Sequence, residues 1–203
     1  IGGFDDLNRT GQTIRVLGAA GFEHQVQNRA KLKAALDLTP NLRLTYVGSL
    51  FINTTDSTVD SYLSNPATGT AVYSGSLNID GRPYSVAASA FSNSIYHTEQ
   101  RHWSHNVSLA GSSSRFDWQV IGTLYDIDKD IQRIASTALP AAQNGGADTI
   151  TRLDGTGWKT LDAKGAWRSD AMATHTISFG LHGDWFEIDS NRYNTADWIN
   201  GDR

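Results

Sequence analysis

Residues 42–53 read LRLTYVGSLFIN, and this stretch decides the fold class. Leu, Tyr, Gly and Ile occupy every second position, whereas Arg, Thr, Ser and Asn fill most of the positions between them. Val47 and Phe51 are the exceptions on the polar side. Because side chains alternate between the two faces of a strand, the spacing predicts a β-strand with one apolar and one polar face. Residues 32–38 alternate in the same way before a Thr-Pro-Asn turn, which predicts a hairpin, with a helix over 29–38 as the alternative.

The same pattern returns in two further pairs of segments, each joined by a short connection. Residues 103–111 pair with 116–125, and residues 160–168 pair with 177–185. A weaker strand is expected near 12–18. The sequence therefore predicts an all-β protein of about six or seven meandering antiparallel strands.

Long polar segments separate the three predicted hairpins. They cover residues 54–97, residues 130–157 and the tail 188–203, and they are rich in Asn, Asp, Gly and Ser. Compact soluble domains rarely contain connections of that length, whereas outer-membrane barrels alternate short turns on one side with long loops on the other. The alternation itself also fits a soluble β-sandwich whose polar face is solvated.

Aromatic residues lie near both ends of the predicted strands. Phe116, Trp118 and Trp167 are close to short turns, and Trp185 is close to a long polar segment. Transmembrane barrels carry aromatic girdles at both membrane interfaces, so these positions favour a barrel. In a sandwich, the same residues would fill the core.

Composition narrows the classes of function. The 203 residues carry a formal net charge of −4, which does not suggest nucleic acid as a partner. The absence of cysteine excludes disulfides, thiol catalysis and cysteine-based metal sites. No run of apolar residues is long enough for a transmembrane helix. Hydrolase, zinc-protease and phosphate-binding motifs are absent, so we expect neither an enzyme nor a cofactor.

Five stretches, in this order, resemble the barrel portion of TonB-dependent outer-membrane receptors. The resemblance spans roughly residues 28–200. Its motifs are NLRLTYVGSLFIN at 41–53, FDWQVIGTLYDIDKD at 116–130, GWKTLD at 157–162, SFGLHGD at 178–184 and YNTADW at 193–198.

The resemblance implies a fragment of an antiparallel transmembrane β-barrel over residues 1–203, with short periplasmic turns and long extracellular loops. Barrels of this kind have 22 strands around a plug, so we interpret the chain, which opens on Ile-Gly-Gly, as an internal piece of a longer protein. Neither the plug domain nor the closing C-terminal strands are recognisable in this sequence.

The resemblance also implies a location and a function. The location is the outer membrane of a Gram-negative bacterium, in contact with its lipid. The function is TonB-energised uptake of a large, scarce solute, a small molecule or metal chelate and most often a ferric siderophore, with TonB acting through a plug domain. Two alternatives remain: a passive porin-type barrel, and a soluble all-β module that binds carbohydrate.

Aromatic residues of the long segments are the candidate ligand-binding residues. Their rings could stack on a flat chelate or a sugar, or they could pack the loops. They are Tyr62, Tyr73, Tyr84, Phe91, Tyr96 and Tyr193.

The histidines form no predicted metal site. His97 and His105 share a strand face but lie about 26 Å apart at ~3.3 Å per residue, and His102 points to the opposite face. His182, Asp162 and Asp184 also share a face. They could act as an acid–base group, but paired charges on a hydrated wall explain them as well.

Overall fold

The structure is a computed structural model that describes residues 2–7, 13–79, 81–87, 95–169, 172 and 174–201. Side chains are described from residue 21 onward, except at 77, 79 and 86. This part of the chain is β-structure apart from turns and one short 3-10 helix, η1, at Ala141–Asn144. No helix among the described residues is long and apolar enough to cross a membrane.

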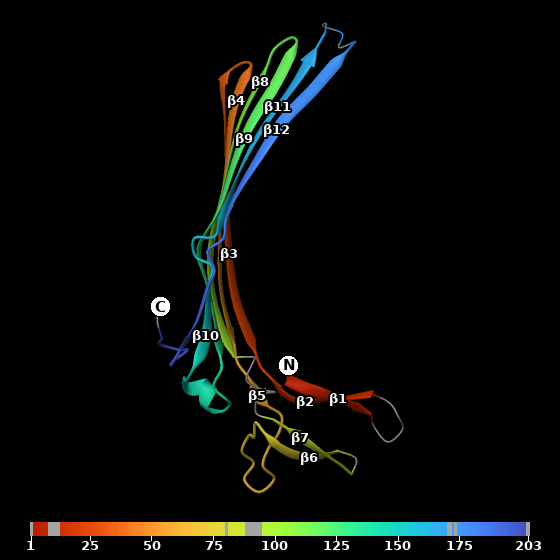
Figure 1. Cartoon of the computed structure of the whole chain (residues 1–203), viewed down its shortest axis with the longest axis vertical. Helices are drawn as coiled ribbons and strands as arrows, with labels where there is room; N and C mark the ends of the chain where they lie inside the picture. The colour runs from red at the N-terminus through yellow and green to blue at the C-terminus, as the bar shows by residue number, and fades with distance from the viewer. Residues whose placement is uncertain are drawn as a thin grey trace.

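Six long antiparallel strands form the main sheet, which rises as one tall, bent ribbon (Figure 1). Their spatial order is β12-β11-β9-β8-β4-β3, so each strand pairs with its neighbours in the meander. The strands are β3 (Glu23–Thr39), β4 (Leu42–Ser57), β8 (Tyr96–Ser112), β9 (Phe116–Ala135), β11 (Gly157–Arg168) and β12 (Thr176–Glu187).

All three predicted hairpins are confirmed, in β3–β4, β8–β9 and β11–β12. Residues 29–38 are extended, so the helical alternative is wrong. The short connections gather at one end of the sheet, at the top of Figure 1. We call this the turn end and the opposite one the loop end.

The loop end contains short additional strands. β10 (Asp148–Arg152) pairs with the far part of β9 and with β13 (Asn191–Thr195). The weak strand expected near 12–18 is β2 (Thr13–Ala20), which lies between β1 (Gly2–Leu7) and β5 (Asp60–Ser61). A separate hairpin joins β6 (Gly75–Ile79) to β7 (Arg82–Val86).

The polar connections are shorter and more structured than the sequence predicts. β4 runs to Ser57, β9 runs to Ala135, and strands also form within the segments expected as loops at 54–97, 130–157 and 188–203. The apolar alternation ends near Asn53, but backbone pairing continues, as Thr54–Glu99 and Ser57–Tyr96 show. Hydropathy therefore marks only part of each strand.

The described strands do not close into a barrel. β3 and β12 are the two edges of the sheet. The chain exposes 12911 Å² of surface, whereas about 9,300 Å² is typical of a compact monomer of this mass. Most of the six-stranded sheet therefore has both faces uncovered.

A small apolar cluster packs the loop end. Val59, Ile95, Ala135, Leu139 and Ala142 are its buried members, with Leu63, Tyr73 and Trp198 packed against them. The Trp198 indole Nε1 donates a hydrogen bond of 2.6 Å to the carbonyl of Ala142. These contacts join the segment after β4, the segment after β9 and the C-terminal tail.

Candidate functional site

One face of the sheet is mainly apolar, with Asp126 and Lys159 as charged exceptions beside Trp103 and Trp185. Strand pairing places a single row of six apolar side chains across all six strands: Leu36, Leu44, Leu109, Val120, Ala163 and Leu181. No described element covers this row, and Leu36 and Leu181 remain 59% and 80% exposed. In water, an apolar patch of this extent would be strongly unfavourable.

The apolar face forms a band of limited height. On β4 it runs from Leu42 to Ile52, eleven residues, and the ten steps between them span about 33 Å at ~3.3 Å per step. At the usual tilt of barrel strands, this length corresponds to a band about 25 Å tall, the height of the apolar belt of transmembrane barrels. Trp118 and Trp167 lie toward the turn end of the band, and Trp103 and Trp185 lie toward its other end.

The same face becomes charged directly beyond Ile52. Arg101, which pairs with Ile52 across β4 and β8, forms an ion pair with Asp128. Lys129 forms an ion pair with Glu99. His97 Nδ1 lies 2.6 Å from an Asp56 carboxylate oxygen.

The hydrogen bond from Lys129 holds the pKa of Glu99 below its ordinary value, although partial burial opposes this effect. Along the strands, the apolar band on this face thus ends at the row of Ile52, and the rows beyond it carry ion pairs.

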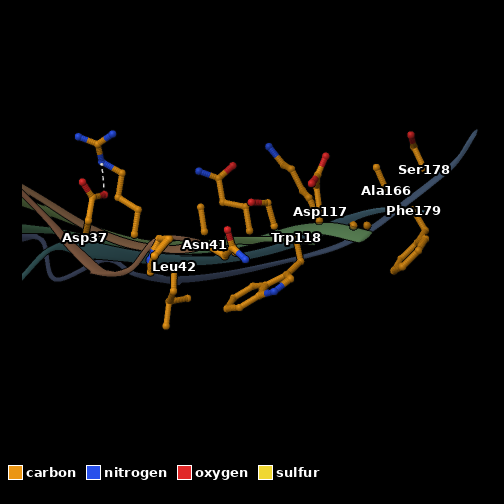
Figure 2. Close-up of a pocket in the computed structure, with 17 residues that line it drawn as sticks. Asp37, Asn41, Leu42, Asp117, Trp118, Ala166, Ser178 and Phe179 are labelled. Atoms are coloured by element: carbon orange, nitrogen blue, oxygen red, sulfur yellow. Dashed lines mark ion pairs between the residues drawn. The ribbon is translucent and has the colours of Figure 1, made fainter. Parts of the chain in front are cut away.

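The opposite face is polar along the same strands. Figure 2 shows Asp37, Asp117 and Ser178 on one side of the sheet, and Leu42, Trp118 and Phe179 on the other. The sheet bends toward its polar side, and a hollow of about 960 Å³ lies at the turn end. Such an arrangement fits a wall with lipid on one side and water or polar protein on the other.

Several charges on the polar face are paired. Asp37 pairs with Arg43, and Asp117 pairs with Arg168. His182 lies between two carboxylates, with Nδ1 2.9 Å from Asp162 Oδ1 and Nε2 2.9 Å from Asp184 Oδ1. The structure therefore brings this predicted trio together, and it does so on an open, polar wall.

Aromatic rings and one guanidinium cross the polar face in a line, which we call the ring row. It comprises Arg29, Phe51, His102, Tyr125, Trp158 and Phe186, from β3 to β12. The line steps by two residues between β8 and β9, because His102 pairs with Ile127 and Tyr125 pairs with Ser104. The guanidinium of Arg29 lies 5.4 Å from the Phe51 ring centroid. The Phe51 and His102 centroids are 5.6 Å apart, and the Tyr125 and Trp158 rings stack at 4.0 Å.

His102 links the centre of the ring row to polar neighbours. Its Nδ1 lies 2.8 Å from the Tyr125 hydroxyl, and its Nε2 lies 3.3 Å from Asp130 Oδ2. Gln100 Nε2 donates to the same Asp130 oxygen at 3.0 Å, and Asn53 Nδ2 donates to Gln100 Oε1 at 2.9 Å. A line of two amides and a carboxylate thus lies next to Phe51 and His102.

Sequence reasoning missed the ring row because its members are adjacent only once the strand register is known. Phe51 stands out in the sequence merely as an exception to the alternation, and Tyr125 falls on the polar side of its strand. One feature of the sequence could have indicated the ring row: aromatic residues recur at positions on the polar side of successive predicted strands.

The tyrosines predicted to bind ligand lie on separate segments of the loop end. Tyr73 packs against the apolar cluster, and its hydroxyl accepts a hydrogen bond of 3.2 Å from Gln143. Tyr193 pairs with Ile150 across β13 and β10.

Tyr96 donates to Glu23 at 2.7 Å, a hydrogen bond that raises the pKa of Tyr96. Tyr62 is exposed, and Tyr84 lies on β7. Phe91 lies outside the described residues.

The predicted placement of the histidines on β8 is confirmed. His97 lies on the charged continuation of the apolar face and His102 on the polar face. His105 lies in the apolar band, where its Nδ1 is 2.8 Å from the Tyr46 hydroxyl. Among the residues with described side chains, no group of three His, Asp or Glu residues is arranged to hold a metal ion.

No protein-family model matches the chain, and no curated protein and no solved structure matches it either. The likeness to TonB-dependent receptors therefore remains a prediction from the sequence motifs.

Proposed function

We propose that this chain forms part of the wall of an outer-membrane β-barrel, in a receptor that takes up a large, scarce solute with energy from TonB. The observation that carries the membrane part of the proposal is the apolar row from Leu36 to Leu181, bounded by aromatic rings and then by ion pairs on one face. A lipid bilayer would remove this band from water while leaving the ion-paired part outside.

The two open edges support the same proposal. In lipid, every backbone N–H and C=O must be paired, so a spanning sheet has to close. β3 and β12 would pair with further strands to complete the wall. The polar face would then line the interior.

Two alternative functions fit the chain less well. A soluble carbohydrate-binding module would need a second layer about 10 Å away to cover the apolar row, and no described element forms such a layer on the part of the sheet toward the turn end (Figure 1). A passive porin would have a similar wall. The five sequence motifs, in their order along the chain, favour a TonB-dependent receptor over a porin.

Fractionation of the native polypeptide tests this proposal. The tryptic peptide at 116–129, FDWQVIGTLYDIDK, would be followed by mass spectrometry through separated envelope fractions and sized by gel. We expect it in the outer membrane, in a chain much heavier than 22.1 kDa that also carries a plug sequence. A heavy outer-membrane chain without a plug would favour a porin, and a soluble chain of about this mass would contradict the barrel.

A further inference from the structure

We propose that the ring row binds an uncharged carbohydrate, with sugar rings stacked on its aromatic side chains. The location of this site inside a barrel rests on the proposed function, whereas its ligand chemistry rests on the side chains themselves.

The rings are continuous across the sheet rather than along one strand. Phe51 contacts His102, His102 contacts Tyr125 edge-on at 5.8 Å, and Tyr125 stacks on Trp158. Phe186 is the cross-strand partner of Trp158. A ligand that follows this row would meet one ring after another.

The rings are also accessible. Trp158 is 37% exposed and Phe186 is 71% exposed, on a face whose other side chains are mostly polar. A hollow of about 380 Å³ is lined by Phe51, His102 and Tyr125 together with Ser49 and Ser104. Apolar rings left in water are unfavourable, so a ligand that covers them gains free energy.

Hydrogen-bonding groups lie beside the ring row on its first three strands. Gln27, Asn53, Gln100 and Asp130 are aligned across β3, β4, β8 and β9. The first three lie two residues from Arg29, Phe51 and His102, about 7 Å along the strands, whereas Asp130 lies five residues from Tyr125. Pyranose rings present C–H groups on their faces and hydroxyls at their edges, so they can stack on rings while their hydroxyls reach the amides and the carboxylate.

The charges favour a neutral ligand. Outside the Asp37–Arg43 and Asp117–Arg168 pairs, the polar face of the six strands carries as many carboxylates as cations. The carboxylates are Glu23, Asp130, Asp162 and Asp184, and the cations are Arg29, Lys31, Lys33 and Lys164. Net attraction for an anionic chelate would require an excess of positive charge on this wall. This is why we infer a carbohydrate, although the sequence resemblance implies a ferric siderophore.

Binding to the native full-length polypeptide, purified in detergent, tests the inference. The probes are a panel of uncharged hexasaccharides that includes maltohexaose and cellohexaose, and a ferric tris-catechol complex as the anionic chelate. Binding is measured by calorimetry and by tryptophan fluorescence. We expect at least one hexasaccharide to bind, and Trp158→Ala and Phe186→Ala each to weaken it at least tenfold.

Matched variants separate stacking from folding. Trp158→Phe keeps a ring and should retain most of the affinity. Val47→Ala removes an apolar side chain from the same face outside the ring row and should leave binding unchanged. Three results would overturn the inference. No hexasaccharide binds, or binding is unchanged by the substitutions at Trp158 and Phe186, or only the ferric complex binds in a way that depends on these rings.

Fractionation distinguishes this failure from failure of the proposed function. A soluble protein that binds hexasaccharides through Trp158 would refute the barrel and support the ligand class. An outer-membrane protein that does not bind the hexasaccharides would support the barrel and refute the ligand class.

Discussion

Leu161 and Thr160 are neighbours on β11 whose side chains lie on opposite faces of the sheet. Leu161 lies in the middle of the apolar band and pairs with Gly122 and Gly183, whereas Thr160 pairs with Thr123 and Asp184 on the polar face. Placing Arg at these two positions therefore compares the two environments directly.

We predict that Leu161→Arg lowers the free energy of unfolding in lipid by about 2–4 kcal/mol, because a charged side chain on the lipid face of a barrel carries that cost. Thr160→Arg should cost about 1 kcal/mol or less, since its charge would remain on the polar face near Asp184. Denaturant unfolding of the native polypeptide in lipid vesicles measures both. Equal losses would contradict the assignment of the faces.

Glu99 makes a pH-dependent contribution at the charged end of the same face. Because its pKa is lowered in the folded state, its stabilisation is complete above its ordinary value of 4.5 and is lost as the pH falls below that value. We predict that Glu99→Gln costs about 1 kcal/mol or less at pH 7. It should also flatten the loss of stability below pH 4.5, and an unchanged pH profile would refute the role of the Lys129 ion pair.

At the scale of elements, a β-bulge in β9 marks the boundary between the band and the charged surface. Asp128 has no partner opposite it, because Arg101 pairs with Lys129 and His102 pairs with Ile127. The turn before β11 docks against the bulge through a 2.9 Å hydrogen bond from the Ile127 amide to the carbonyl of Thr156. Gly155 supplies the positive φ, 87°, that this turn requires.

Deleting Asp128 would remove the extra residue and leave Lys129 and Asp130 opposite Arg101 and Gln100, so the later side chains of β9 should keep their faces while the strand loses the bulge. We predict faster amide hydrogen exchange in residues 153–156, which dock against the bulge, with the Lys129–Glu99 pair kept and little change in residues 42–52. Asp128→Asn, which keeps the bulge, should leave exchange in residues 153–156 nearly unchanged. Uniform acceleration across the sheet would contradict a local role for the bulge.

The elements also show how much the sequence could predict. The strands around residues 42–52 and 116–125 were recognisable because one face is apolar throughout. β10 and β13 were not, because their sequences, DTITR and NRYNT, have little apolar contrast and their positions depend on pairing with each other and with β9. The ring row was hidden for the same reason, since register between strands decides which aromatic side chains meet.

At the scale of the whole molecule, the two uncovered faces and two open edges have a clear consequence. In aqueous buffer without detergent, we predict that the 203-residue chain expressed alone aggregates, because β3 and β12 expose unpaired backbone beside an apolar surface. Analytical ultracentrifugation tests this prediction. A stable monomer in buffer would contradict it.

The contact of the apolar face with lipid is the central claim, and tryptophan quenching by brominated lipids tests it most directly. Variants of the native polypeptide would each retain one tryptophan, with Phe at the others, and would be reconstituted after a check of native folding. We predict strong quenching for Trp103 and Trp118 on the apolar face, and little quenching for Trp158 on the polar face. Equal quenching of Trp158 and Trp103, or no quenching of either, would contradict the account.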